Sequence, residues 1–313
     1  MSEPQAMEYN WGGDGSDLHE PVRAHVEAAL VPSDDPYPPP LDELLRLGNP
    51  QTEADIPQRI AALGLIQAHV PDLLRMARDR ALNTAQSDSD EIWAPAHALT
   101  ALEQLDISAV VPELISLFDV DDEWSREQLV DLLSAAGPGA LEPLGRYIQD
   151  HTRWVYGRLA AIEALGDLVD LHPDLRDQAL AILSDAMERA ADNAPDVNGF
   201  LLGQLLDLDA VEALPVIQRA FEADAVDETI AGDWGEVLAA LGQMPDLNDP
   251  LVERSRVRRE ARHGSMFGLD RPEAPLPQAA AAPAKPRKSA TASKKNKRKM
   301  SKASRKANKK RRK

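Results

Sequence analysis

From residue 41 to about residue 241, apolar side chains recur in a pattern that predicts pairs of amphipathic helices. Each copy has an Ala- and Leu-rich first helix, a short break that usually carries a proline, and a second amphipathic helix. A proline in the first turn of a helix removes no hydrogen bond, so it separates the two helices without weakening the second. The copies are 60–64 with 70–74, 98–102 with 111–115, 129–133 with 142–144, 160–166 with 172–175, and 202–206 with 214–217, followed by a last first helix at 237–242.

The leucine near the end of each first helix sets the period of this repeat. Successive marker leucines are 31 to 41 residues apart, which is typical of paired-helix repeats, and the unequal steps indicate loop insertions. Small residues on the first helices predict close approach of neighbouring helices. The sequence therefore predicts an all-α fold, an α-solenoid of stacked helix hairpins. The marker leucines are Leu63, Leu102, Leu133, Leu165, Leu206 and Leu241, and the small residues are Ala61, Ala62, Ala160, Ala161, Ala239 and Ala240.

The segments on either side of the repeats have a different composition. The run Pro36–Pro40 must be extended, because proline fixes φ and disfavours helix in the residue before it, and it reads as a hinge. The Lys/Arg-rich end lacks the apolar residues that folding needs, so we predict that it is disordered. The predicted segments are 1–36, flexible with one amphipathic helix over 17–30; 37–263, the repeat domain with a last helix over 249–263; 264–284, a Pro/Ala linker; and 285–313, the basic tail.

The composition excludes several classes of protein. The chain has no cysteine, so disulfides, thiolate metal sites and cysteine nucleophiles are absent. Aromatic residues make up only 4% of the 313 residues, so Leu, Ala, Ile and Val must build the core, which favours helices. No signal peptide and no stretch of roughly 20 apolar residues is visible. We expect a cytoplasmic monomer without membrane contact.

The charge is divided sharply along the chain. Of the 35 basic residues, 16 lie in the last 29 positions, which contain no acid; the 19 that remain face 52 acidic residues. The first 284 residues therefore carry about −33 and the tail about +16. This asymmetry indicates a folded acidic body with a basic interaction arm. The tail residues predicted to contact a polyanion are Lys294, Lys295, Lys297, Arg298, Lys299, Lys309, Lys310, Arg311, Arg312 and Lys313.

The repeats resemble HEAT-like repeats of the kind first described in phycobilin lyases. The stretch from Pro36 to about Leu241 is similar to a poorly characterised bacterial family of HEAT-repeat proteins, some of which end in a Cys/His zinc module. This chain ends in Lys and Arg instead, so no role of that module is carried over. The resemblance implies a HEAT-like fold and little chemistry. It rests on Pro36–Leu41, Ile92–Ala98, Asn198–Leu201 and Gly232–Trp234.

Four of the five tryptophans fall just before or at the start of a first helix, and acids precede most of them. A Trp-studded acidic rim of this kind predicts binding of a basic or extended peptide. The alternative is structural: acids cap helix N-termini, and tryptophan wedges neighbouring repeats apart. We weight the structural interpretation more heavily for each single residue. The candidate partner-binding residues are Trp93, Trp124, Trp154, Trp234, Asp121, Asp122 and Glu123.

No motif indicates catalysis or a cofactor. The acidic run 119–123 lacks the glycine and ligand spacing of a calcium loop, so a solvated turn is the better interpretation. The histidines at 69, 97, 151 and 172 lack paired metal-ligand spacing and are taken as core or surface residues. We predict no catalytic residue, no metal ligand and no cofactor.

The sequence thus favours a non-enzymatic scaffold or adaptor that binds an unidentified protein partner. Its tail would contact RNA, the ribosome or another polyanion, or would fold back onto the acidic body. Two alternatives stay open. One is a lyase-type enzyme or enzyme-assembly factor with a site in the solenoid groove, and the other is an acidic chaperone-like binder of basic clients.

Overall fold

The computed structural model of this chain describes residues 20–50, 52–86, 88–120, 123–246 and 248–266. Within these residues every regular element is a helix and no strand occurs, so the predicted all-α class is confirmed. The α-helices are α1 (Glu20–Ala29), α2 (Ile56–Ala62), α3 (Val70–Ala77), α4 (Arg80–Asn83), α5 (Ala94–Leu102), α6 (Val111–Ser116), α7 (Glu123–Ala135), α8 (Leu141–Gln149), α9 (Val155–Leu171), α10 (Arg176–Glu188), α11 (Pro195–Asp207), α12 (Leu214–Glu222), α13 (Glu228–Ala231), α14 (Trp234–Ala240) and α15 (Pro250–Met266).

Short 3₁₀ turns join many of these helices. Five of them lead directly into the second helix of a pair, where they turn the chain back. The turns are η1 (Leu41–Arg46), η2 (Gln67–His69), η3 (Asp90–Trp93), η4 (Ser108–Val110), η5 (Leu117–Asp119), η6 (Pro138–Ala140), η7 (Pro173–Leu175), η8 (Ala190–Asp192) and η9 (Val211–Ala213).

The described part of the chain divides into two compact units, with the boundary between Val226 and Asp227. The division falls inside the stretch 37–263 that the sequence analysis assigned to a single repeat domain. The predicted linker start at 264 also lies within α15, which continues to Met266. Most of the predicted linker and the whole predicted tail lie outside the residues that the structure describes.

All five predicted helix pairs occur in the first unit. They are α2 with α3, α5 with α6, α7 with α8, α9 with α10, and α11 with α12. The punctuating proline is the second residue of α3, α6 and α12, where its missing N–H leaves no intrahelical bond unmade. The hydrophobic periodicity and the proline positions therefore located these helices correctly.

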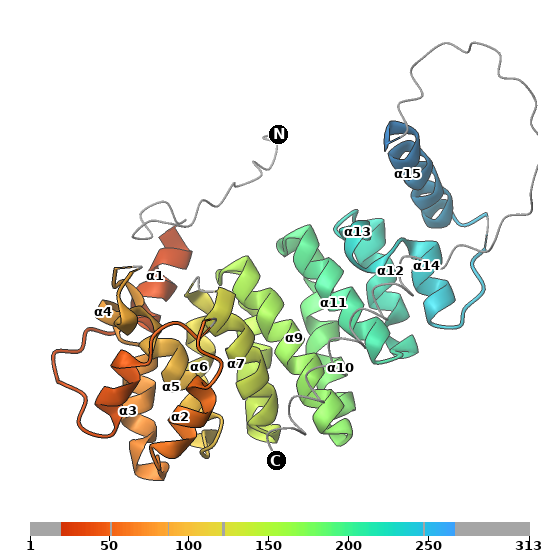
Figure 1. Ribbon diagram of the computed structural model, residues 1–313. Helices are drawn as coiled ribbons and strands as arrows, with labels where there is room; N and C mark the ends of the chain where they lie inside the picture. Colours follow the sequence, from red (N-terminus) through yellow and green to blue (C-terminus); the bar gives the residue numbers. More distant parts are fainter. Residues whose placement is uncertain (1–19, 51, 87, 121–122, 247, 267–313) are drawn as a thin grey trace, which may run out of the picture. The chain divides into compact units, whose positions relative to one another are not determined.

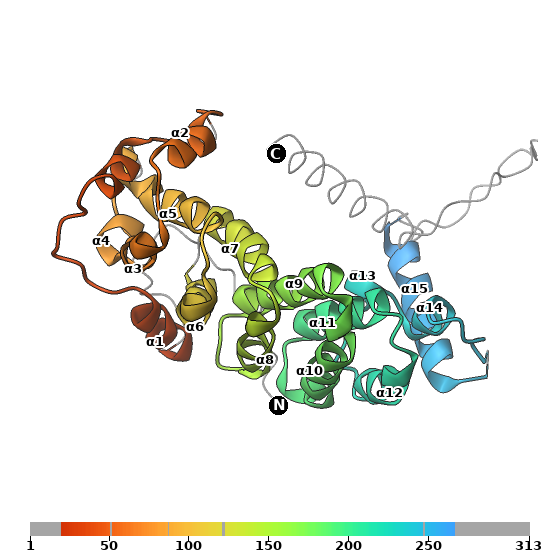
Figure 2. The same cartoon turned by 90° about the horizontal axis from the view of Figure 1, so that it is seen from below.

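Within the first unit the helices form two rows (Figures 1 and 2). First helices α5, α7, α9 and α11 pack against one another in chain order, and second helices α6, α8, α10 and α12 do the same. Each pair therefore contacts mainly the pair before it and the pair after it. The core between the rows is aliphatic, with Leu99, Leu133, Leu165 and Leu205 at most 1% exposed.

The prediction about small residues holds only for the middle of the chain. Ala160 and Ala161 on α9 are buried, as the close approach of neighbouring helices requires. Ala61 and Ala62 on α2 are exposed, because α2 buries the opposite face through Ile56 and Ile60. Ala239 and Ala240 on α14 are also exposed, since α14 buries Trp234 and Val237.

One glycine permits an unusually close contact between successive pairs. A Cβ atom at Gly157 in α9 would lie 2.4 Å from the carbonyl oxygen of Phe118 and 2.4 Å from the hydroxyl oxygen of Tyr147. Real Cβ atoms do not approach other atoms so closely, and the Phe118 oxygen is fixed in the backbone. The first turn of α9 can therefore lie against η5 and α8 only with glycine at this position.

The helix α1, predicted within a flexible N-terminal segment, packs against α6 and η5. Arg78 donates to the carbonyl oxygens of Ala28 and Ala29 at 3.0 and 2.9 Å, and Arg80 donates to those of Glu27 and Leu30 at 3.3 Å. The positive charges thus satisfy the carbonyl groups that a helix leaves unpaired at its C-terminus. The described part of the N-terminal segment is therefore held in place by specific contacts.

The second unit places α15 against α14. Arg258 pairs with Glu228 at 3.5 Å, and Arg259 pairs with Asp233 at 2.6 Å. The two arginine side chains are 38% and 45% exposed, whereas both carboxylates are at most 5% exposed. These partly exposed arginines therefore neutralise buried carboxylates within the second unit.

Candidate functional site

The four candidate tryptophans occupy the predicted positions along the chain. Trp93 directly precedes α5, Trp124 is the second residue of α7, Trp154 directly precedes α9, and Trp234 begins α14. Trp93 is half-buried, whereas Trp154 and Trp234 are only 2% and 3% exposed. The side chain of Trp124 lies outside what the structure describes.

Trp154 lies in a packed aromatic and cationic environment. The Arg126 guanidinium of α7 stands 4.7 Å above its ring, and Tyr156 meets it edge to face at 5.2 Å between ring centroids. A guanidinium over an indole face is attracted by the quadrupole of the ring. The cation–π partner expected from a bound peptide is therefore supplied here by the chain itself.

Asp119, at the end of η5, is the centre of a buried polar cluster. Its carboxylate is 0% exposed. Tyr147 donates its hydroxyl to Oδ1 at 2.8 Å, Arg153 donates Nη1 to Oδ2 at 2.6 Å, and the backbone N–H of Trp154 lies 3.5 Å from Oδ1. The cluster therefore joins η5 to α8 and to the start of α9 across 28 to 35 residues of sequence.

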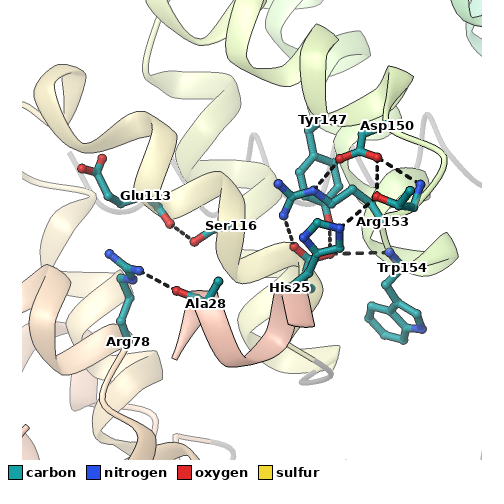
Figure 3. Close-up of polar contacts among 11 residues, drawn as sticks. His25, Ala28, Arg78, Glu113, Ser116, Tyr147, Asp150, Arg153 and Trp154 are labelled. Carbon is teal, nitrogen blue, oxygen red and sulfur yellow. Dashed lines mark hydrogen bonds and ion pairs between the residues drawn. The ribbon is translucent and has the colours of Figure 1, made fainter. Parts of the chain in front are cut away.

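A second carboxylate and helix α1 extend this cluster toward solvent. Asp150 accepts from Arg153 Nε at 3.1 Å and from the Thr152 hydroxyl at 2.6 Å. Figure 3 shows His25 of α1 directed at the residues around Asp150 and Arg153, and Nε2 of His25 lies 2.9 Å from the hydroxyl oxygen of Thr152. The same cluster thus holds the middle of α1.

The cluster shifts the protonation equilibria of its members. Burial raises the pKa of Tyr147 well above its ordinary value, and the negative charge of Asp119 raises it further. Burial alone would lower the pKa of Arg153, but the charge and hydrogen bond of Asp119, together with Tyr147 and the hydrogen bond to Asp150, outweigh it and the net shift is upward. Burial would raise the pKa of Asp150, but hydrogen bonds from Thr152 and Arg153 lower it overall. These groups keep fixed charges at neutral pH, which suits a structural cross-link better than proton transfer.

The interpretation of the acidic run 119–123 as a solvated turn is wrong for Asp119, which is fully buried and paired with Arg153. Asp121 and Asp122 lie outside the described residues, as does the side chain of Glu123, so their predicted role in partner binding stays a prediction. Within the described part of the chain, no group of three or more His, Asp or Glu side chains is arranged to hold a metal ion.

His97 of α5 is a core histidine. It is 1% exposed, and its Nε2 lies 2.8 Å from the carbonyl oxygen of Gly48. Burial lowers its pKa below the ordinary value of about 6.5. As pH falls below about 6.5, His97 binds a proton in the unfolded chain but not in the folded chain, so folding stability is lost on acidification.

We therefore expect the unfolding free energy of His97→Gln to decrease less between about pH 7.5 and pH 5.5 than that of the unaltered protein. Urea denaturation at several pH values measures this slope. The matched control is His151→Gln, because His151 is exposed and this change should leave the slope as in the unaltered protein. Equal slopes for His97→Gln and the unaltered protein would contradict the assignment.

In the second unit, Trp234 and Asp233 form a helix start rather than an open rim. Asp233 accepts from the Glu236 N–H at 3.1 Å while Glu236 accepts from the Asp233 N–H at 3.2 Å, which is a capping box. Trp234 donates its Nε1–H to Asp249 at 3.0 Å. The structural interpretation accounts for the positions of Trp234 and Trp154, while partner binding by Trp93 and Trp124 stays a prediction.

The first unit contains a second buried polar network, which was not predicted from the sequence. Arg158 and Asn198 are 3% and 0% exposed, and Asn193 connects them, accepting from Arg158 at 2.6 Å and donating to Asn198 at 2.9 Å. Asn198 also donates to the carbonyl oxygens of Ala190 and Ala225 at 2.8 and 2.7 Å. The polar residues Arg158 and Asn198 in the first turns of α9 and α11 were the available signal.

The ten predicted polyanion contacts of the tail, Lys294 to Lys313, lie outside the described residues. Every helix in the described ranges is too short or too polar to serve as a membrane span. Comparison of this chain with protein-family models, with curated proteins and with solved structures finds no match.

Proposed function

We propose that this chain is a non-enzymatic scaffold that binds a protein partner through its helical repeats and contacts a polyanion, such as RNA or the ribosome, through its basic tail. The observation that carries the proposal is the separation of charge along the sequence. The last 29 residues hold 16 Lys and Arg and no acid, whereas acids outnumber bases 52 to 19 in the rest. Only the tail has the charge to attract phosphates.

The proposal includes a HEAT-like α-solenoid as the scaffold. Two rows of helices that pack in chain order support it, because a solenoid stacks each hairpin only on its neighbours. The punctuating prolines at 71, 112 and 215 support it as well. Such a stack offers an extended surface for a protein partner.

Binding of a partner by the repeats and binding of a polyanion by the tail can strengthen each other, because the linker holds both on one chain. A tail of Lys, Arg, Ser and Ala has too little apolar area to fold, so we propose that it acts as an unstructured arm. Once the repeats bind their partner, the contact of the arm with a nearby polyanion becomes effectively intramolecular. Two weak contacts can then give a useful combined affinity.

Deletion of residues 285–313 is the test of this proposal. If the tail makes six to ten phosphate contacts, the affinity of the full chain for single-stranded RNA should fall by roughly 10²·⁵–10⁴ between 50 and 200 mM salt. The truncated chain should show no measurable binding under the same conditions. Fluorescence anisotropy with a labelled single-stranded RNA measures both quantities.

A matched variant separates charge from length. Replacing the cationic residues at 294, 295, 297, 298 and 299 with glutamine keeps the tail but removes five contacts. The slope of log affinity against log salt should become shallower by about 3.5, at roughly 0.7 per contact for single strands. Circular dichroism and thermal melting should match the full chain in both variants. Undiminished RNA binding by the truncated chain would reject the proposal.

A further inference from the structure

A shallow depression lies in the first unit where the ends of α8 and α10 meet the starts of α9 and α11. Its polar lining consists of Gln149, His151, Arg158, Arg189, Asp192 and Asn193. Arg158 comes from the first turn of α9, and Arg189 directly follows α10. Two guanidinium groups, one from α9 and one from the end of its pair partner α10, therefore line the same depression.

Arg158 is buried without a counter-ion. Its side chain is 97% buried, and its Nε and Nη2 donate to neutral acceptors, the Ile148 carbonyl at 2.9 Å and the Asn193 side chain at 2.6 Å. Among the described residues Nη1, the third nitrogen, makes no hydrogen bond. Arg158 lines the depression, so Nη1 is the donor that a bound group there could use.

This arrangement is costly unless an anion completes it. Transfer of a charge out of water is compensated only by pairing and hydrogen bonding. Burial lowers the pKa of Arg158 from its ordinary value, while the negative charges of Asp150 and Asp196 partly offset this shift. Asp150 is bound to Thr152 and Arg153, and Asp196 accepts from the Val197 N–H, so neither serves as the counter-ion of Arg158.

Arg189 also lines the depression, but unlike Arg158 it is exposed. In the described ranges it forms no ion pair, although the chain is rich in acids and Arg153, Arg176 and Arg219 each pair with carboxylates. Asp192 is the one acid in the lining. The two arginines and the one aspartate of the lining have formal charges that sum to +1.

We propose that this depression binds a single carboxylate of the protein partner, held by Nη1 of Arg158 and by the guanidinium of Arg189. Guanidinium groups present paired N–H donors that match the two oxygens of a carboxylate. A net charge near +1 balances one carboxylate but not a doubly charged phosphate, which the acidic body around it would also repel. This inference rests on the proposed partner binding and specifies that the partner presents a carboxylate to the repeats.

The test is a titration of the full chain with acetate, followed by NMR of the arginine Nε–H groups. Acetate at constant ionic strength should shift the resonances of Arg158 and Arg189 in a saturable way. Arg189→Gln should weaken this binding by roughly 10-fold, the value of one charge-assisted hydrogen bond. Arg146→Gln is the matched control, because Arg146 is exposed on α8 and pairs with Glu142, and it should leave acetate affinity unchanged.

Three results would overturn the inference. They are shifts that do not saturate, equal acetate affinity in Arg189→Gln and the unaltered chain, and tighter binding of inorganic phosphate than of acetate. Arg189 is exposed, so its replacement should preserve the fold, and thermal melting verifies this. The titration uses neither RNA nor the tail deletion, so its failure is distinct from failure of the proposed polyanion contact.

Discussion

Replacement of Asp119 by alanine is expected to lower the free energy of unfolding by about 3–5 kcal/mol, the usual cost of removing one partner of a buried ion pair. The carboxylate is fully buried, and its loss leaves the Tyr147 hydroxyl and Nη1 of Arg153 without their acceptor. The melting temperature should fall by roughly 10 °C for a folded unit of this size. Asp119→Asn keeps the shape of the side chain and should lie between alanine and the unaltered protein.

The control for Asp119 is an ion pair of similar length at the surface. Glu142 accepts from Arg146 at 2.7 Å, but their side chains are 78% and 64% exposed. Glu142→Gln should therefore cost no more than about 0.5 kcal/mol, because solvent screens exposed pairs. Urea denaturation followed by circular dichroism compares the variants, and an Asp119→Ala variant as stable as Glu142→Gln would show that the cluster contributes little.

Replacement of Trp154 by alanine is expected to cost about 3–5 kcal/mol, as for other large buried aromatic side chains. The change would leave a cavity and would remove the ring that Arg126 and Tyr156 contact. Trp154→Phe preserves most of the apolar volume and should cost about 1–2 kcal/mol. Thermal and urea denaturation measure both losses.

Trp93→Ala provides the comparison for Trp154. Trp93 is only half-buried, so its removal should destabilise the chain less than removal of Trp154. If Trp154→Ala melts like the unaltered protein, then its burial contributes nothing to stability and the structural interpretation fails. If the two alanine variants differ in stability as expected, a loss of partner binding by Trp93→Ala can be attributed to removal of the half-buried Trp93 side chain and not to unfolding of the chain.

The repeat pattern was predictable because its signals are local. Leucine spacing, prolines in the first helical turn and alanine-rich first helices all act within a few residues, so they located α5, α6, α9 and α12. The boundary after Val226 gave no comparable signal. It depends on which helices contact one another, which the sequence does not display.

The polar clusters escaped prediction for the same physical reason. Asp119 stands in an acidic run that looks solvated, and its partners Tyr147 and Arg153 are 28 and 34 residues further along the chain. Arg158 reads as an ordinary polar position on α9 until the packing buries it. A side chain's neighbours in space decide whether its charge is paired, and those neighbours come from other repeats.

The contacts of α1 have a mechanical consequence. Arg78 and Arg80 hold its end, α6 and η5 lie along it, and His25 meets Thr152 between α8 and α9. One short helix thus braces three successive hairpins that would otherwise flex where each meets the next. Bending there would have to break the brace, so the early repeats should be stiffer than the hairpins after α9.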